Sequence, residues 1–239
     1  MSESVSSEKK EPEENEGEGD KLNPKLIAFD FLYGAVKGLS GLFFKAFMDL
    51  QIEGQENIPL RGKAILTTIT PNIIRDMLII AQVSGRKIHF MLDPKLMKHQ
   101  IMGPVLKSLG MIRGTESKED TEPIEKVFEI LNEKGDLVGM TPESRHDSEV
   151  QIKSMAAIIK FAIAGDAPII PIAITTHKTK ILNMFTGDGI KVKVGNPLFV
   201  EKRLNREKHR AERYELAEDI INIIDSLKER PDLEEFNSN

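Results

Sequence analysis

Residues 136–147, DLVGMTPESRHD, combine a short apolar run with a dense polar turn. The run Leu137–Met140 is followed at once by Pro142 and by a cluster of acidic, basic and hydroxyl side chains. An apolar run of this length, bounded by turn residues, predicts a strand buried on both faces. The polar residues after it then form a loop at the carboxyl end of that strand, where open α/β sheets carry their binding sites.

Strand-like and helix-like segments alternate on both sides of this stretch. The expected strands are Leu50–Gly54, Lys63–Thr70, Lys87–Leu92, Asp136–Met140, Pro168–Ile174 and Ile190–Val194. The expected helices are Ile73–Gln82, Asp93–Leu109, Thr121–Glu133, Val150–Ala164 and Glu207–Leu227. Such alternation predicts an α/β fold, with helices packed on a mixed or largely parallel sheet.

The composition changes near both ends of the chain. Residues 1–22 are rich in Glu, Ser and Gly, and this composition predicts a disordered acidic tail. We expect an amphipathic helix over residues 24–49, one α/β domain over residues 50–229, and a polar tail over residues 230–239. The first residues contain no apolar core, so they do not form a secretory signal.

Residues 24–49 are apolar on more than one face. Five of the eleven phenylalanines of the chain lie between Phe29 and Phe47, and Asp30, Lys37 and Lys45 interrupt the run. A membrane-spanning helix needs roughly 20 mostly uncharged residues, so the charges favour a helix lying in the membrane interface. The alternative is a helix docked on the core of the protein itself. The interface interpretation predicts a peripheral membrane protein on the cytoplasmic face.

Charge and residue content exclude several classes of site. The net charge is −5, but the first 20 residues contribute −6, so the remainder is close to neutral and does not predict nucleic-acid binding. The chain has no cysteine, which excludes disulfides, thiolate metal sites and cysteine nucleophiles. His and Asp residues do not cluster at metal-ligand spacing, so we expect no metal. The sequence indicates no oligomeric state.

Two loops before residue 136 carry candidate site residues. After the strand ending near Thr70, Asn72 can cap the next helix and places Arg75 and Asp76 in its first turn. Simple helix capping is the alternative interpretation of this loop. Farther along, Gly110 and Gly114 flank Arg113, which we expect to point into open space and to meet an anion, although an ordinary surface arginine fits the segment as well.

Two later loops complete the candidate site. The turn after Met140 carries Glu143, Ser144, Arg145 and His146. The apolar strand Pro168–Ile174 has prolines three residues apart, and because proline cannot donate to a sheet ladder, we expect it at a sheet edge or a strand end. It could line an acyl pocket or belong to the core.

The order of these pieces over residues 25–200 resembles the lysophosphatidate (1-acylglycerol-3-phosphate) acyltransferase family. Pro71-Asn72 and Asp76 stand where the family has Asn-His-x4-Asp, and Gly110 and Arg113 resemble its second motif. Other matches are Ile52–Pro59 before the first core strand, Pro142-Glu143-Ser144-Arg145 for the family's Pro-Glu-Gly-Thr-Arg, Pro168–Pro171 for its proline-flanked strand, and Val192–Leu198 for its last strand.

The resemblance implies roles for these residues. The family's arginines hold the acceptor phosphate, so Arg113 and Arg145 inherit that role, with Asn72, Arg75, Glu143 and Ser144 beside them. Ile73, however, stands where the family has its histidine base, and Asp76 follows Asn72 by four residues instead of six. The catalytic candidates are therefore Asp76, as orienting residue, and His146, as a substitute base, with His89 and His177 as further histidines near strand ends.

The leading hypothesis is an acyltransferase-fold protein of glycerophospholipid metabolism. It would transfer an acyl group from an acyl-CoA or acyl-carrier thioester, used as co-substrate without a cofactor, to a lysophospholipid or glycerol phosphate at a membrane surface. The missing histidine leaves two alternatives. One is a catalytically inactive protein that binds anionic lipid in the same pocket, and the other is a membrane-associated scaffold.

Overall fold

The computed structural model describes residues 24–69, 72–117, 119–142, 147–181 and 185–229. The predicted tails, 1–22 and 230–239, lie outside these residues. The helices are α1 (Pro24–Phe47), α2 (Ile73–Ile80), α3 (Pro94–Met97), α4 (Met102–Ser108), α5 (Glu122–Phe128), α6 (Ser148–Gly165) and α7 (Arg210–Glu229). The strands are β1 (Gln51–Glu53), β2 (Ala64–Thr67), β3 (Ile88–Leu92), β4 (Ile112–Arg113), β5 (Leu137–Met140), β6 (Ile169–Ile181) and β7 (Phe185–Val194).

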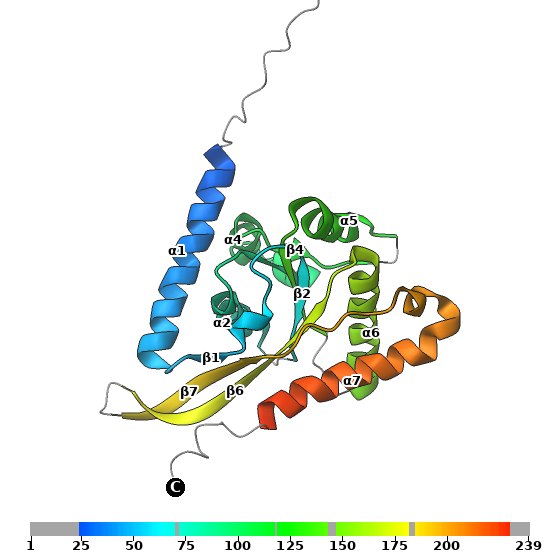
Figure 1. The fold of residues 1–239 in the computed structure, drawn as a ribbon. Coiled ribbons are helices and arrows are strands. Elements are labelled where there is room, and N and C mark those ends of the chain that lie inside the picture. The colour runs from blue at the N-terminus through cyan, green and yellow to red at the C-terminus, as the bar shows by residue number, and fades with distance from the viewer. Residues whose placement is uncertain (1–23, 70–71, 118, 143–146, 182–184, 230–239) are drawn as a thin grey trace, which may run out of the picture.

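The strands form one mixed sheet in the order β1-β7-β6-β2-β5-β3-β4. β6, β2, β5, β3 and β4 run parallel to one another. β7 returns antiparallel to β6 as the second arm of a long hairpin, and β1 pairs parallel to β7 (Figure 1). The mixed α/β sheet expected from the sequence is confirmed.

Helices cover both faces of the sheet, each over its own core. On one face, α5, α6 and α7 bury residues such as Val127, Ile159 and Ile220 against β2, β5 and β6. On the other face, α1, α2 and α4 bury Phe44, Ile79 and Leu106. β2 alternates between the two, since Ile65 belongs to the first core and Leu66 to the second. Strands covered on both sides read as continuous apolar runs, which explains why Leu137–Met140 was recognisable.

The proline-containing strand does not lie at the edge of the sheet. β6 lies between β7 and β2, so the sheet-edge alternative is wrong, whereas the strand-end alternative holds for Pro168, which directly precedes the first residue of β6. Pro171 pairs with Thr67, the last residue of β2, while pairing with β7 starts at Ile172. The missing N–H therefore falls where one ladder ends and the other begins, and an interior strand tolerates the proline.

The single helix expected over residues 93–109 is two helices. The Asp93 side chain caps α3 by accepting from Lys95 N at 2.7 Å, as expected from the sequence. The chain then turns before α4 begins at Met102. Pro104 lacks the N–H that a continuous helix would use, and its ring excludes the preceding turn, so it is tolerated only near the start of a new helix.

Helix α1 docks by one side and leaves the other open. Phe44 is buried, Lys87 Nζ lies 2.8 Å from Asp30 Oδ1, and the Tyr33 hydroxyl accepts from Ile88 N at 3.1 Å. The opposite side exposes large apolar side chains: Ile27, Phe29, Phe31, Leu32, Leu39, Leu42, Phe43 and Phe47. The docked side agrees with the alternative of a helix packed on the core, and the membrane-interface interpretation of the other side stays a prediction. In Figure 1, α1 stands at the margin of the molecule.

The segment Ile27–Phe47 is also long and apolar enough to cross a membrane. Its mean hydropathy is 1.3 over a window that is 11% buried within the protein. The interrupting charges were expected to exclude a span, and by length and composition they do not.

Candidate functional site

The candidate site lies at the carboxyl edge of the parallel strands. β2, β5, β3 and β4 end at Thr67, Met140, Leu92 and Arg113. Because these neighbouring strands run in the same direction, their ends share one edge of the sheet. The loops and helix starts that follow are thereby brought together from distant parts of the sequence.

The first candidate residues form the start of α2. Asn72 caps this helix, its Oδ1 accepting from Arg75 N at 3.2 Å, as the sequence predicted. Asp76 is 1% exposed, and its Oδ1 accepts from Arg75 Nε at 2.6 Å. Ile73 is the first residue of α2. The carboxylate expected to orient a base is therefore bonded to a guanidinium, which stabilises its charge in a buried position.

Two hydroxyls that the sequence reasoning missed lie just before this helix. Thr67 and Thr68 are fully buried at the end of β2, and neither Oγ1 has a hydrogen-bond partner within the described part of the chain. Buried polar atoms without partners are uncommon and costly. Only a contact map reveals them, since threonine at a strand end is ordinary in sequence.

Arg113 does not point into open space. Its guanidinium makes a two-pronged pair with Asp120, with Nη1–Oδ2 at 2.6 Å and Nη2–Oδ1 at 3.0 Å. Glu116 and Glu122 add contacts at 3.0 and 3.1 Å. The bond to Arg113 lowers the pKa of Asp120 and so keeps it ionised. The acidic run just after Gly114 was the sequence signal for these carboxylates around Arg113. Our expectation that Arg113 points into open space is wrong.

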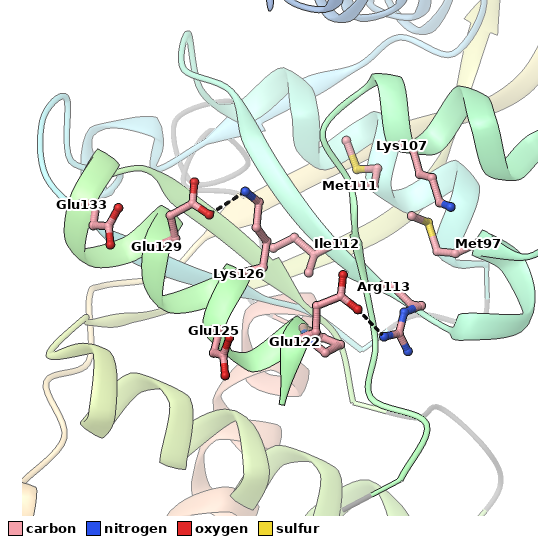
Figure 2. Close-up of a pocket in the computed structure, with 11 residues that line it drawn as sticks. Met97, Lys107, Met111, Ile112, Arg113, Glu122, Glu125, Lys126, Glu129 and Glu133 are labelled. Atoms are coloured by element: carbon pink, nitrogen blue, oxygen red, sulfur yellow. Dashed lines mark hydrogen bonds and ion pairs between the residues drawn. The ribbon is translucent and has the colours of Figure 1, made fainter. Parts of the chain in front are cut away.

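Arg113 also lines the larger cavity of this region, which measures about 880 Å³. Figure 2 shows Arg113, Lys107 and Met97 on one side and the side chains of α5 on the other. The lining carries four carboxylates, Glu122, Glu125, Glu129 and Glu133, against three cations, Lys107, Arg113 and Lys126. The cavity is therefore slightly acidic, and a phosphate entering it has to displace carboxylates from Arg113.

A second cavity, of about 270 Å³, opens at the same edge. Its walls are the ends of β3 and β5, the segment Gly114–Thr115, and one side of α6 with Ala157 and Phe161. Asp76 lines neither of these two cavities. The structure thus brings the two cavities together at the carboxyl edge and places the Arg75–Asp76 pair outside their linings.

The remaining candidates divide into two groups. Glu143, Ser144, Arg145 and His146 lie outside the described residues, so their roles stay predictions. His89 is the second residue of β3, at the amino edge of the sheet, where its Nδ1 lies 2.7 Å from Gly110 O. That position is opposite to the edge where Thr67 and Arg113 end their strands.

His177 lies within the long strand β6. Its Nε2 is 3.3 Å from Asp49 Oδ2, which also accepts from the Thr179 hydroxyl at 2.9 Å. The other ring nitrogen, Nδ1, is buried without a partner among the described residues. This histidine–aspartate pair ties the hairpin to the end of α1, and its second nitrogen is closed to solvent.

Comparison with known proteins gives a family for the sequence and a similar solved structure for the fold. The acyltransferase family model matches residues 49–175, which include α2 and Arg113. The fold is similar to the crystal structure of PlsC, the 1-acyl-sn-glycerophosphate (LPA) acyltransferase of Thermotoga maritima, with a TM-score of 0.57 and 16% sequence identity, covering 89% of this chain and 86% of that one. No curated protein matches the sequence. Since the family model spans more than half of its length, this chain belongs to the acyltransferase family.

Proposed function

We propose that this protein is a membrane-associated acyltransferase of glycerophospholipid metabolism. It transfers an acyl group from an acyl-CoA or acyl-carrier thioester to the hydroxyl of a lysophospholipid or glycerol phosphate. The observation that carries the proposal is the family match over residues 49–175, because that span contains the carboxyl edge with its two cavities. The exposed apolar side of α1 supports work at a membrane surface, and we place that surface on the cytoplasmic side as part of the proposal.

The reaction requires a base near the acceptor hydroxyl. The hydroxyl oxygen attacks the thioester carbonyl, a C–O bond forms, the C–S bond breaks, and the hydroxyl proton passes through the base to the departing thiolate. Ile73 cannot accept a proton. We assign the base to His146, oriented by Asp76, and the phosphate-binding role to Arg113 and Arg145, together with Asn72, Arg75, Glu143 and Ser144.

The proposal includes a rearrangement of two ion pairs at the site when the acceptor binds. Arg75 holds Asp76, and Asp120 holds Arg113. A phosphate is a charge-assisted acceptor that suits guanidinium groups at least as well as a carboxylate does. An acceptor phosphate that recruits Arg75 and Arg113 would release Asp76 for the histidine.

One observation favours a second function, which is lipid binding without turnover. The helix start where the family carries its histidine has Ile73, and the nearby carboxylate is bonded to Arg75. A protein with this site would bind anionic lipid through its arginines and leave a thioester intact.

The deciding experiment is acyl transfer in detergent micelles, with labelled long-chain acyl-CoA and lysophosphatidate or glycerol phosphate. Asp76→Asn and His146→Ala test the assigned pair, and His99→Ala, an exposed histidine between α3 and α4, is the matched control. Turnover lost in the first two variants and kept in the control supports the enzyme. Vesicle binding without turnover supports the binding protein. Failure of both turnover and lipid binding points to the scaffold.

A further inference from the structure

A separate cavity lies between α6 and the start of α7. It measures about 180 Å³. It is lined by Lys153, Ala156, Ala157, Lys160, Glu207, Arg210, Arg213 and Tyr214. Both helices pack on the sheet face opposite α1 and α2, and Figure 1 shows α7 crossing α6 on the side of the molecule away from α1. None of its lining residues is a candidate for acyl transfer.

The lining has a large excess of positive charge. Four cations, Lys153, Lys160, Arg210 and Arg213, face a single carboxylate, Glu207. The Glu207 carboxylate lies 4.0 Å from the nitrogen of Lys160 and 3.7 Å from those of Arg210 and Arg213. None of these distances is within hydrogen-bond range, and Glu207 is 69% exposed. Glu207 therefore lies near three of the cations without a hydrogen bond to any of them. Lys153 pairs with Glu149, outside the lining, at 3.5 Å, and the lining itself keeps a net positive charge.

Arg213 is the most deeply buried cation of this cavity, and one of its N–H groups has no acceptor among the described residues. Its side chain is 2% exposed, and Nη1 donates to Leu204 O at 2.6 Å. Its Nε is buried and has no hydrogen-bond acceptor among the described residues. A buried guanidinium whose Glu207 partner lies beyond hydrogen-bond range, and whose Nε–H is unused, is costly unless another anion compensates it.

The direction of α7 adds to the positive potential. Arg210 is the first residue of this helix, and Arg213 lies in its first turn. The N-terminus of a helix carries partial positive charge, so cations are disfavoured there and anions are stabilised. The acid of that turn, Glu212, does not line the cavity, because its carboxylate is bonded to His209 Nδ1 at 2.6 Å and to Arg203.

We propose that this cavity binds the phosphate group of a small molecule. Its volume of about 180 Å³ is below the roughly 300 Å³ of a complete small-molecule site, so it fits a charged group and not a whole ligand. A phosphate monoester carries a charge between about −1.5 and −2, which matches the cation excess better than a carboxylate does. The planar fork of Arg210 suits its oxygens, and Arg213, whose Nη1 donates to Leu204 O and whose Nε is buried, adds its Nη2.

Two sources would supply that phosphate. Ala157 lines both this cavity and the one of about 270 Å³ at the carboxyl edge, so the two are neighbours across α6. A CoA-type acyl donor has phosphates far from its thioester and could reach from this cavity to the one at the carboxyl edge. This source rests on the proposed function. A free phosphorylated metabolite would occupy the site independently of acyl transfer.

Calorimetric titration of the full chain at low ionic strength tests the site, with pyrophosphate, CoA and 3′-dephospho-CoA as probes. The double variant Lys153→Ala/Lys160→Ala and the single variant Arg210→Ala should each weaken pyrophosphate binding about tenfold, since each removes exposed charge from the lining. Glu207→Gln should tighten it about threefold by removing the competing carboxylate. Lys208→Ala, an exposed neighbour outside the lining, is the matched control.

The effect of substituting Arg213 is measured as a change in thermal stability and not by titration, because this buried side chain also supports the fold. Pyrophosphate should raise the melting temperature of the parent protein by more than that of the double lysine variant, because stabilisation depends on the ratio of ligand concentration to Kd. Absence of saturable pyrophosphate binding, or equal weakening by Lys208→Ala, would overturn the site whatever the outcome of the acyl-transfer assay. If the parent protein binds CoA but not 3′-dephospho-CoA, and the variants do not bind CoA, the donor is the source of the phosphate. Pyrophosphate binding without CoA binding identifies a free phosphate.

Discussion

The Asp120 carboxylate accepts from both terminal nitrogens of Arg113, from Nη1 at 2.6 Å and from Nη2 at 3.0 Å, in the planar two-pronged geometry that a phosphate would use. The carboxylate therefore occupies the position proposed for the acceptor phosphate. Under the proposed role of Arg113, Asp120 competes with the acceptor phosphate, and the affinity for the acceptor then depends on a residue outside every family motif quoted above.

Asp120→Asn is expected to strengthen acceptor binding. With the competing charge removed, the KM for lysophosphatidate should fall by up to about tenfold, equivalent to about 1.4 kcal/mol. Glu122→Gln removes a single contact from a side chain that is 86% exposed, so its effect should be smaller. Steady-state kinetics, or a lipid-binding titration if turnover is absent, measures both. A higher KM in Asp120→Asn would mean that the pair holds Arg113 in its binding position.

The Arg75–Asp76 pair should contribute to stability. Arg75→Ala leaves the buried Asp76 carboxylate without this partner, and we expect a loss of about 1–3 kcal/mol in the free energy of unfolding. The double variant Arg75→Ala/Asp76→Asn should recover part of that loss, because an amide is cheaper to bury than an unpaired charge. Urea denaturation of the parent, both single variants and the double variant measures the coupling. Strictly additive effects would show that the two side chains do not support each other.

Adjacent phenylalanines on α1 should separate docking from membrane binding. Phe44 is 5% exposed and belongs to the core, so Phe44→Ala should cost about 3 kcal/mol of folding stability. Phe43 is 52% exposed, and Phe43→Asp should leave stability within about 0.5 kcal/mol while it weakens binding to anionic vesicles. Co-sedimentation with vesicles and thermal unfolding report the two effects. Unchanged vesicle binding by Phe43→Asp would exclude the exposed side of α1 as the contact.

His89 should make the fold sensitive to mild acid. Burial lowers the pKa of its imidazole, the neighbouring Lys87 and Lys134 act in the same direction, and the Gly110 carbonyl and Asp136 oppose them. The unfolded chain therefore takes up the proton first, at the ordinary pKa of about 6.5, and stability falls as the pH drops through that value towards the lower folded pKa.

Melting temperatures measured between about pH 7.5 and pH 5.5 test this sign. His89→Gln should show a shallower decline than the parent, because it removes the group that the unfolded state protonates. The exposed His99, changed to Gln, is the control and should follow the parent. A steeper decline in His89→Gln would show that the pairing with Asp136 outweighs burial.

The sequence determined the fold class and the positions of most elements, because both depend on local patterns. Continuous apolar runs such as Leu137–Met140 mark strands covered on both faces, and the caps Asn72 and Asp93 mark helix starts through their own neighbouring N–H groups. These signals act over a few residues, so no tertiary contact is needed to detect them. The exceptions are instructive, since Pro104 was the local signal that divided α3 from α4 and was passed over.

The contacts of the site residues depend on the tertiary structure. Arg113 is caged by Asp120, Asp76 is held by Arg75, and Pro171 is accommodated inside the sheet where the β2 ladder ends. The cationic cavity between α6 and α7 joins Lys153 and Arg213, which are far apart in the sequence. Charge pairing and burial depend on which surfaces the folded chain brings together. A sequence neighbourhood can show that carboxylates are near an arginine, but it does not show which of them bonds to it.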